Sequence, residues 1–157
     1  MELSKVLTPD RILVPIPGGD KTAVITALMD VLGASGNLSN PSAALDAVLR
    51  REAERSTGIG YGLAIPHGKC EGCRTLLMAC GKPAAPIDFQ SVDGRPVTFV
   101  VLLVSSPEQT GPHIQALAKI SRLMNMEAFR SAVNDARSAQ ELHQAIVTFE
   151  ARDGTAA

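Results

Sequence analysis

A short segment near the middle of the chain combines glycine, proline and histidine in a spacing that suits chemistry on a phosphoryl group. Residues 58–69 are Gly-Ile-Gly-Tyr-Gly-Leu-Ala-Ile-Pro-His-Gly-Lys. Glycine at every second position excludes a helix and removes side chains from one side of the backbone, so that a phosphate could approach main-chain N–H groups. The candidate amides for that contact belong to Thr57, Gly58, Gly60 and Gly62. The spacing matches neither a Walker loop nor the dinucleotide-binding fingerprint.

His67 directly follows Pro66, which makes a ring nitrogen of the histidine a candidate nucleophile. Proline has a fixed φ and no N–H, so it stiffens the backbone immediately before the imidazole. A histidine held rigidly at the end of the apolar run 63–66 is well placed to attack a phosphoryl group. A lone histidine more often caps a strand end with one hydrogen bond, and the glycine pattern alone shifts that balance only modestly.

A second histidine, His113, follows Pro112 at the start of a predicted helix. The free N–H groups and the dipole at a helix N-terminus disfavour imidazolium and favour an incoming anion. We therefore expect a neutral ring that donates a hydrogen bond, so that His67 would attack while His113 orients the phosphoryl group. The alternative is a histidine that merely occupies the helix N-terminus. His143, in the last predicted helix, is expected on the surface.

Arg50, Arg51 and Glu52 lie near the end of another predicted helix. Basic groups in the last turn of a helix suit its dipole, which is a sufficient structural explanation. The functional interpretation is that one of the two arginines turns toward His67 and pairs with phosphate through its planar guanidinium.

The cysteines allow one further interpretation, a zinc site. His67, Cys70 and Cys73 are spaced His-x₂-Cys-x₂-Cys, and Cys80 follows. A histidine held on a strand by Pro66 and a cysteine inside an apolar run fit such a site poorly. The simpler interpretation places Cys70 and Cys73 in a loop and Cys80 in the core as a small apolar residue. We therefore expect no metal.

The composition narrows the function classes. The 157 residues suit one domain, and a net charge of −1 argues against a general binder of nucleic acid or membrane surfaces. No run approaches the roughly 20 apolar residues that cross a bilayer, and the first ten residues lack a signal-peptide pattern. One Tyr, four Phe and no Trp argue against a base-stacking or sugar-stacking surface. We expect a cytoplasmic protein without a disulfide framework, because three cysteines is an odd number.

Short apolar strands alternate with amphipathic helices along the chain. Strands are predicted at residues 11–14, 63–66, 76–80 and 97–104, and the last is apolar throughout, as in a strand covered on both faces. Helices are predicted at residues 24–33, 41–55 and 128–133, and from residues 112 and 138 onward. The alternation predicts the α/β class with helices on both faces of one sheet, in a single domain over residues 1–150. Residues 151–157 are expected to form a frayed tail.

Three stretches together resemble one known family. They are Arg51-Glu52, the run from Ser56 to Lys69, and Gly111-Pro-His-Ile-Gln-Ala-Leu-Ala118. They are similar to the IIA domain of the sugar phosphotransferase system, in the fructose/mannitol class that includes the nitrogen-regulatory IIA proteins. The resemblance covers nearly the whole chain, including residues 86–97, and the glycine-to-histidine motif is long and specific. Tyr61 departs from it, because many relatives have a small polar residue there, which could alter the partner surface or the fit around phosphate.

The resemblance implies both a fold and a mechanism. The fold would be a mixed sheet sandwiched between helices, with His67 phosphorylated and with His113 and Arg51 supporting the site. The chain would be a phosphotransferase component that accepts phosphate from an HPr-like donor protein and passes it to a IIB-type acceptor, without a cofactor. Alternatively, it would be a nitrogen-regulatory IIA whose phosphorylation controls its binding to a transporter or kinase.

Overall fold

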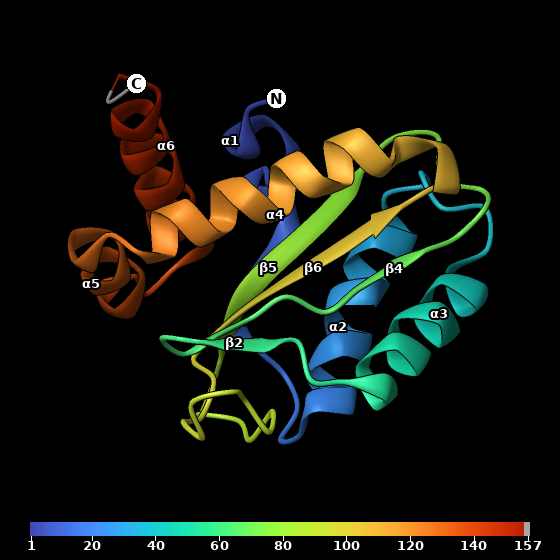
Figure 1. Cartoon of the computed structure of the whole chain (residues 1–157), viewed down its shortest axis with the longest axis horizontal. Helices are drawn as coiled ribbons and strands as arrows, with labels where there is room; N and C mark the ends of the chain where they lie inside the picture. The colour runs from blue at the N-terminus through green and yellow to red at the C-terminus, as the bar shows by residue number, and fades with distance from the viewer. Residues whose placement is uncertain (156–157) are drawn as a thin grey trace.

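The computed structural model describes residues 1–155, and its elements follow the predicted alternation of strands and helices (Figure 1). The helices are α1 (Leu3–Val6), α2 (Lys21–Ala34), α3 (Pro41–Glu54), α4 (Thr110–Met124), α5 (Glu127–Asp135) and α6 (Ala139–Thr155), with 3-10 turns η1 (Pro9–Arg11) and η2 (Pro107–Gln109). The strands are β1 (Ile12–Ile16), β2 (Gly58–Gly60), β3 (Leu63–Ala64), β4 (His67–Lys69), β5 (Leu77–Pro83) and β6 (Phe99–Ser105). None of the helices in residues 1–155 has the length and apolar character needed to cross a membrane.

The strands form one mixed sheet in the order β1-β5-β6-β3-β2, and β4 also pairs with β6. β1 is parallel to β5, and β5 is antiparallel to β6. β3 and β4 both run parallel to β6, whereas β2 is antiparallel to β3. The central strands are therefore β5 and β6, which the sequence predicted as buried.

β3 and β4 are two parts of one interrupted strand that pairs in parallel with β6. Their register is the same, since Leu63 pairs with Phe99 and His67 pairs with Leu103. The interruption includes Pro66, whose nitrogen has no hydrogen to donate, although its carbonyl still accepts a hydrogen bond from the Leu103 amide (3.0 Å). The strand thus carries His67 alongside the central strand of the sheet.

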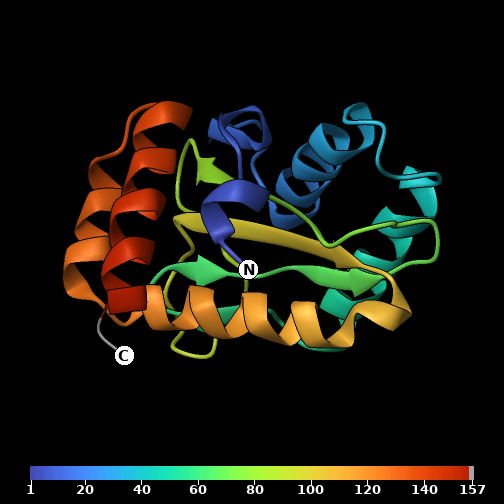
Figure 2. The same ribbon diagram turned by 90° about the horizontal axis from the view of Figure 1, so that it is seen from above.

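Helices cover both faces of the sheet (Figure 2), and a hydrophobic core forms on each face. One core packs against α1, α4, α5 and α6, and the other packs against α2 and α3. β6 supplies alternate residues to each, as the period of two in a strand requires: Phe99, Val101 and Leu103 to the first, Val100, Leu102 and Val104 to the second. The predicted fold class, a mixed sheet between two helical layers, is confirmed.

Several element boundaries differ from the prediction. β1 continues through Pro15, where the sequence predicted its end. β1 lies at the edge of the sheet, a position that tolerates the missing N–H of a proline. α4 begins at Thr110 rather than at Pro112, because the turn η2 leads directly into it.

The last helix extends further than expected. α6 continues to Thr155, through most of the predicted tail. An ion pair joins Asp153 to Arg122 of α4, with 3.3 Å between Oδ2 and Nε, and ties this last stretch to the neighbouring helix. Residues 156 and 157 of the expected tail lie outside the described residues.

Candidate functional site

His67 stands at the first position of β4 with its ring half-buried. Its Nδ1 lies 2.7 Å from the carbonyl oxygen of Ile65. A carbonyl oxygen can only accept a hydrogen bond, so in the neutral ring Nδ1 carries the proton and Nε2 carries the lone pair. Nε2 has no hydrogen-bond partner among residues 1–155, which leaves it free to attack.

Gly68 brings α3 close to this histidine. A Cβ at residue 68 would lie 3.1 Å from both the amide nitrogen and Cγ2 of Val48 in α3, tighter than ordinary van der Waals contact. Glycine at this position therefore permits the close approach of the helix to β4. The C-terminal turn of α3, which carries the arginines, is placed beside His67 as a result.

His113, which the sequence analysis paired with His67 in function, packs against it. The two ring centroids are 5.4 Å apart with an interplanar angle of 75°. His113 is only 6% exposed, and its Nδ1 lies 2.7 Å from Oγ of Ser105. Burial, and secondarily the positive charges of His67 and Lys69, lower the pKa of His113 to about 4. The ring is therefore neutral near pH 7, as expected, but the main cause is burial rather than the helix dipole invoked from the sequence.

Two adjoining depressions meet at His67, and together we call them the His67 hollow. Their volumes are about 300 and 380 Å³, and both are lined by His67 and Arg51. Arg55 lines the first, and Arg50, Lys69 and His113 line the second. The hollow is thus rich in groups that can bind an anion.

Arg51 and Arg55 differ in how they are held. Arg51 reaches the hollow as predicted, and its guanidinium donates a hydrogen bond to the carbonyl of Arg55 (2.8 Å). The exposed guanidinium of Arg55 has no hydrogen-bond or ion-pair partner among the residues that the structure describes. Arg55 was missed in the sequence because it was predicted to be the last helical residue, whereas it adopts an extended conformation (φ −163°) as the C-cap of α3.

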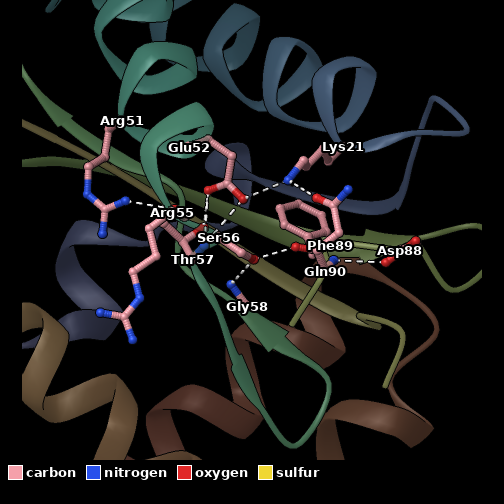
Figure 3. A network of polar contacts seen from close by, with 10 residues as sticks. All are labelled: Lys21, Arg51, Glu52, Arg55, Ser56, Thr57, Gly58, Asp88, Phe89 and Gln90. Carbon is pink, nitrogen blue, oxygen red and sulfur yellow. Dashed lines mark hydrogen bonds and ion pairs between the residues drawn. The ribbon is translucent and has the colours of Figure 1, made fainter. Parts of the chain in front are cut away.

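A buried carboxylate holds the end of α3 against β2 (Figure 3). Glu52 is 5% exposed, and its Oε2 accepts hydrogen bonds from the amide of Thr57 (3.1 Å) and from its hydroxyl (2.6 Å). Lys21 of α2 forms an ion pair with the same carboxylate (3.4 Å) and donates to the side chain of Gln90. Figure 3 shows this network on one side of the turn and the guanidinium of Arg55 directed away from it. The network therefore fixes the turn that presents the arginines to the hollow.

The glycine-rich loop packs against a neighbouring segment, and two of the four amides predicted to contact phosphate are already bonded within the protein. The amides of Thr57 and Gly58, expected to contact phosphate, are bonded to Glu52 and to the Ser56 hydroxyl. A Cβ at Gly58 would lie 2.1 Å from Oγ of Ser91, and Cβ atoms at Gly60 and Gly62 would also approach side chains of the segment 91–98. The glycines make room for this neighbouring segment, and side chains supply the anion-binding groups of the hollow.

Residues 5–148 match the family model described as "Phosphoenolpyruvate-dependent sugar phosphotransferase system, EIIA 2". The chain belongs to this family. The matched range includes Arg51, His67 and His113, which all line the His67 hollow.

The chain is similar to two proteins of this family, and it covers very different shares of their lengths. The "Nitrogen regulatory protein" of Pseudomonas aeruginosa is 31% identical over 147 residues, which are 94% of this chain and 96% of the relative. The "PTS system fructose-specific EIIABC component" of Bacillus subtilis is 33% identical over 138 residues, which are 88% of this chain but only 22% of the relative.

Solved structures share the fold. The nitrogen regulatory protein IIA-Ntr from Neisseria meningitidis superposes with a TM-score of 0.84 at 26% identity, covering 92% of this chain and 98% of that one. The IIA mannitol protein from Escherichia coli superposes with a TM-score of 0.76 at 18% identity, covering 89% and 98%, respectively. The second likeness concerns the fold alone.

Tyr61, where the chain departs from many family members, lies outside the His67 hollow. Its ring stacks on the guanidinium of Arg130 in α5, 4.4 Å from the ring centroid. It lines a separate depression with Arg95 and Thr98. Of the two effects considered from the sequence, this position favours an altered partner surface over an altered fit around phosphate.

The cysteines and His143 also have structural positions. Cys70 donates to the carbonyl of Glu71, whereas Cys73 and Cys80 are buried, and burial raises the pKa of Cys73 to about 11. In residues 1–155, no group of three or more His, Cys, Asp or Glu side chains is arranged to hold a metal ion. The prediction that His143 lies on the surface is wrong, because its half-buried ring bonds through Nε2 to the carbonyl of Ser4 (3.0 Å).

Proposed function

We propose that this protein is a phosphoryl carrier that accepts the group on Nε2 of His67 from an HPr-like phosphohistidine donor and passes it to a IIB-type acceptor. The observation that carries the proposal is the hydrogen bond from Nδ1 of His67 to the Ile65 carbonyl, which leaves the lone pair on Nε2. A neutral ring in this tautomer is a nucleophile without the help of a separate base. The free Nε2 stands beside the guanidinium groups that line the hollow.

The transfer itself exchanges one N–P bond for another. The lone pair of Nε2 forms a bond to phosphorus while the donor's N–P bond breaks and its electron pair returns to the donor nitrogen. Nδ1 of His67 keeps its proton, and the Ile65 carbonyl stabilises the positive charge that the ring gains. Arg51, Arg55 and His113 bind the phosphoryl oxygens, which suits a loose transition state that needs positioning and charge stabilisation more than covalent help. Onward transfer is the reverse reaction with a different partner.

Incubation with phosphoenolpyruvate, Enzyme I and HPr, followed by intact mass and site mapping, tests the proposal. We expect one acid-labile phosphoryl group on His67. His67→Gln should abolish it, while His143→Gln, a matched control outside the hollow, should retain it. Undiminished acid-labile labelling of His67→Gln would refute the assignment.

A regulatory role is the second candidate, and the similarity to nitrogen regulatory proteins favours it. The chain is 31% identical to the Pseudomonas nitrogen regulatory protein over 147 residues, and the Neisseria IIA-Ntr structure superposes with a TM-score of 0.84. In this role phosphorylation would add about two negative charges to the His67 hollow and switch its binding to a transporter or kinase. An Escherichia coli complex of enzyme IIA mannitol with phosphorylated enzyme IIB, of the same fold, supports the carrier role instead.

One pair of experiments separates the two roles. Labelled phosphate that moves from His67 to a purified IIB domain and on to sugar supports transport. Binding of a purified transporter or kinase that depends on the phosphorylation of His67, without onward transfer to IIB, supports regulation. His67→Gln is the control for both, because it cannot take up the phosphoryl group.

A further inference from the structure

Ser105, the last residue of β6, is in contact with His113. Its side chain is fully buried, and its Oγ is 2.7 Å from Nδ1 of His113. Its carbonyl accepts a hydrogen bond from Cys70, and its neighbour on β4 is Lys69, two residues after His67. Ser105 is therefore anchored in the sheet while its hydroxyl faces His113.

The direction of the bond between Ser105 and His113 follows from the partners of the hydroxyl. Among residues 1–155 the Ser105 hydroxyl has His113 as its one hydrogen-bond partner. If Nδ1 of His113 were the donor, the hydroxyl hydrogen would be buried without an acceptor, at a cost of about 1–3 kcal/mol. If the hydroxyl donates, its hydrogen is satisfied and Nδ1 serves as the acceptor. Complete burial of Ser105 therefore favours the second arrangement.

This arrangement places the single proton of the neutral His113 ring on Nε2. Nε2 has no hydrogen-bond partner in the described part of the chain. It is also not one of the fully buried side-chain atoms that lack a partner, so it is not completely shielded from solvent. The ring lines the hollow together with His67, so Nε2 is the nitrogen that opens onto it. Burial keeps the ring neutral by lowering the pKa of His113 to about 4.

We propose that Ser105 is a positioning residue of the transfer reaction, which fixes His113 with its proton on Nε2 so that the ring donates a hydrogen bond to the phosphoryl group. The inference rests on the proposed function of His67 as the phosphoryl acceptor. The two histidines are then held in opposite tautomers. The Ile65 carbonyl makes His67 present a lone pair, and the Ser105 hydroxyl makes His113 present an N–H.

Two-bond ¹H–¹⁵N correlation spectra of the unphosphorylated protein test the tautomers directly. In the wild type we expect His113 protonated on Nε2 and His67 protonated on Nδ1. In Ser105→Ala, Nδ1 of His113 loses its donor, and we expect a measurable population of the Nδ1–H tautomer. Ser106→Ala is the matched control, because Ser106 is also buried and takes part in the cap of η2 rather than in a contact with His113.

Phosphoryl transfer from HPr is measured on the same variants. We expect Ser105→Ala to take up labelled phosphate roughly 3- to 10-fold more slowly, the range that one hydrogen bond supplies, and Ser106→Ala to keep the wild-type rate. A wild-type His113 protonated on Nδ1, or a Ser105→Ala variant with unchanged tautomer and unchanged rate, would overturn the inference. The wild-type spectrum decides the tautomer even if the variant fails to fold. A wild type that takes up no phosphate refutes the proposed function instead, so the two failures are distinguishable.

Discussion

Burial of a neutral His113 makes the stability of the protein depend on pH in a predictable direction. The pKa of His113 is lowered from the ordinary value of 6.5 to about 4, chiefly by burial and then by the charges of His67 and Lys69. Between these two values the unfolded chain binds a proton at residue 113 that the folded protein does not bind. His113 therefore makes the free energy of unfolding fall as the pH falls from about 6.5 toward 4.

The size of the effect follows from the two pKa values. Each unit of pKa difference corresponds to about 1.4 kcal/mol, and the linkage from about pH 7.5 to about pH 5 amounts to at most about 2 kcal/mol for pKa values of 6.5 and 4. The open side of the ring toward the hollow reduces this value. The pH range avoids the carboxylates of Asp10 and Glu150, whose pKa values are lowered and which therefore lose their stabilising charge only under more acidic conditions.

Urea unfolding at several pH values between about 7.5 and 5 measures this dependence. His113→Asn removes the titrating ring while its amide oxygen can still accept from the Ser105 hydroxyl, and we expect a flatter profile, by about 1–2 kcal/mol across the range. The absolute stability of the variant is not the test, because the comparison is between slopes. If the unfolding free energy of the variant decreased as steeply as that of the wild type when the pH is lowered, the assignment of a neutral, buried His113 would be refuted.

The remaining predictions concern the groups that shape the hollow. Arg55→Ala should slow phosphate uptake roughly 10-fold with little change in urea stability, because its guanidinium is exposed and unpaired within residues 1–155; a loss of stability at an unchanged rate would contradict it. Glu52→Ala should lower the free energy of unfolding by about 2–4 kcal/mol, since it leaves the buried Thr57 amide without its acceptor, and a urea midpoint close to that of the wild type would exclude this role. Gly68→Ala should slow transfer by pushing α3 away, with Gly19→Ala as the control at which a Cβ meets nothing within 4 Å; equal transfer rates in the two variants would show that α3 had not moved.

The sequence predicted most helices and central strands because their signals are local. Apolar periodicity and caps lie within a few residues of one another, whereas the order β1-β5-β6-β3-β2 depends on pairing between distant segments. Local patterns also identify glycines, which have no side chain, but they do not show which part of the chain occupies the space beside each glycine. The glycines from Gly58 onward were therefore assigned to phosphate, although the segment that contains Ser91 occupies the adjoining space.

The candidate site shows the same limit. His67, His113 and Arg51 were predicted together through the family motifs, and the structure brings all three to one hollow. Arg55 and Ser105 carried no such motif. The role of Arg55 depends on where α3 ends, and that of Ser105 depends on a contact across the sheet that only the folded chain creates.

The arginines around His67 give the unphosphorylated and phosphorylated forms of the protein different local charges, which a binding partner can distinguish. The charged residues that line the hollow are Arg50, Arg51, Arg55, Lys69 and the single carboxylate Glu54, a local charge of about +3. A phosphoryl group of about −2 would reduce this to about +1, within a molecule whose overall charge is −1. At moderate salt, the electrostatic potential of the hollow extends about 10 Å into the solvent before it is screened. An acidic partner is therefore attracted more strongly to the unphosphorylated form than to the phosphorylated form, even before it contacts His67.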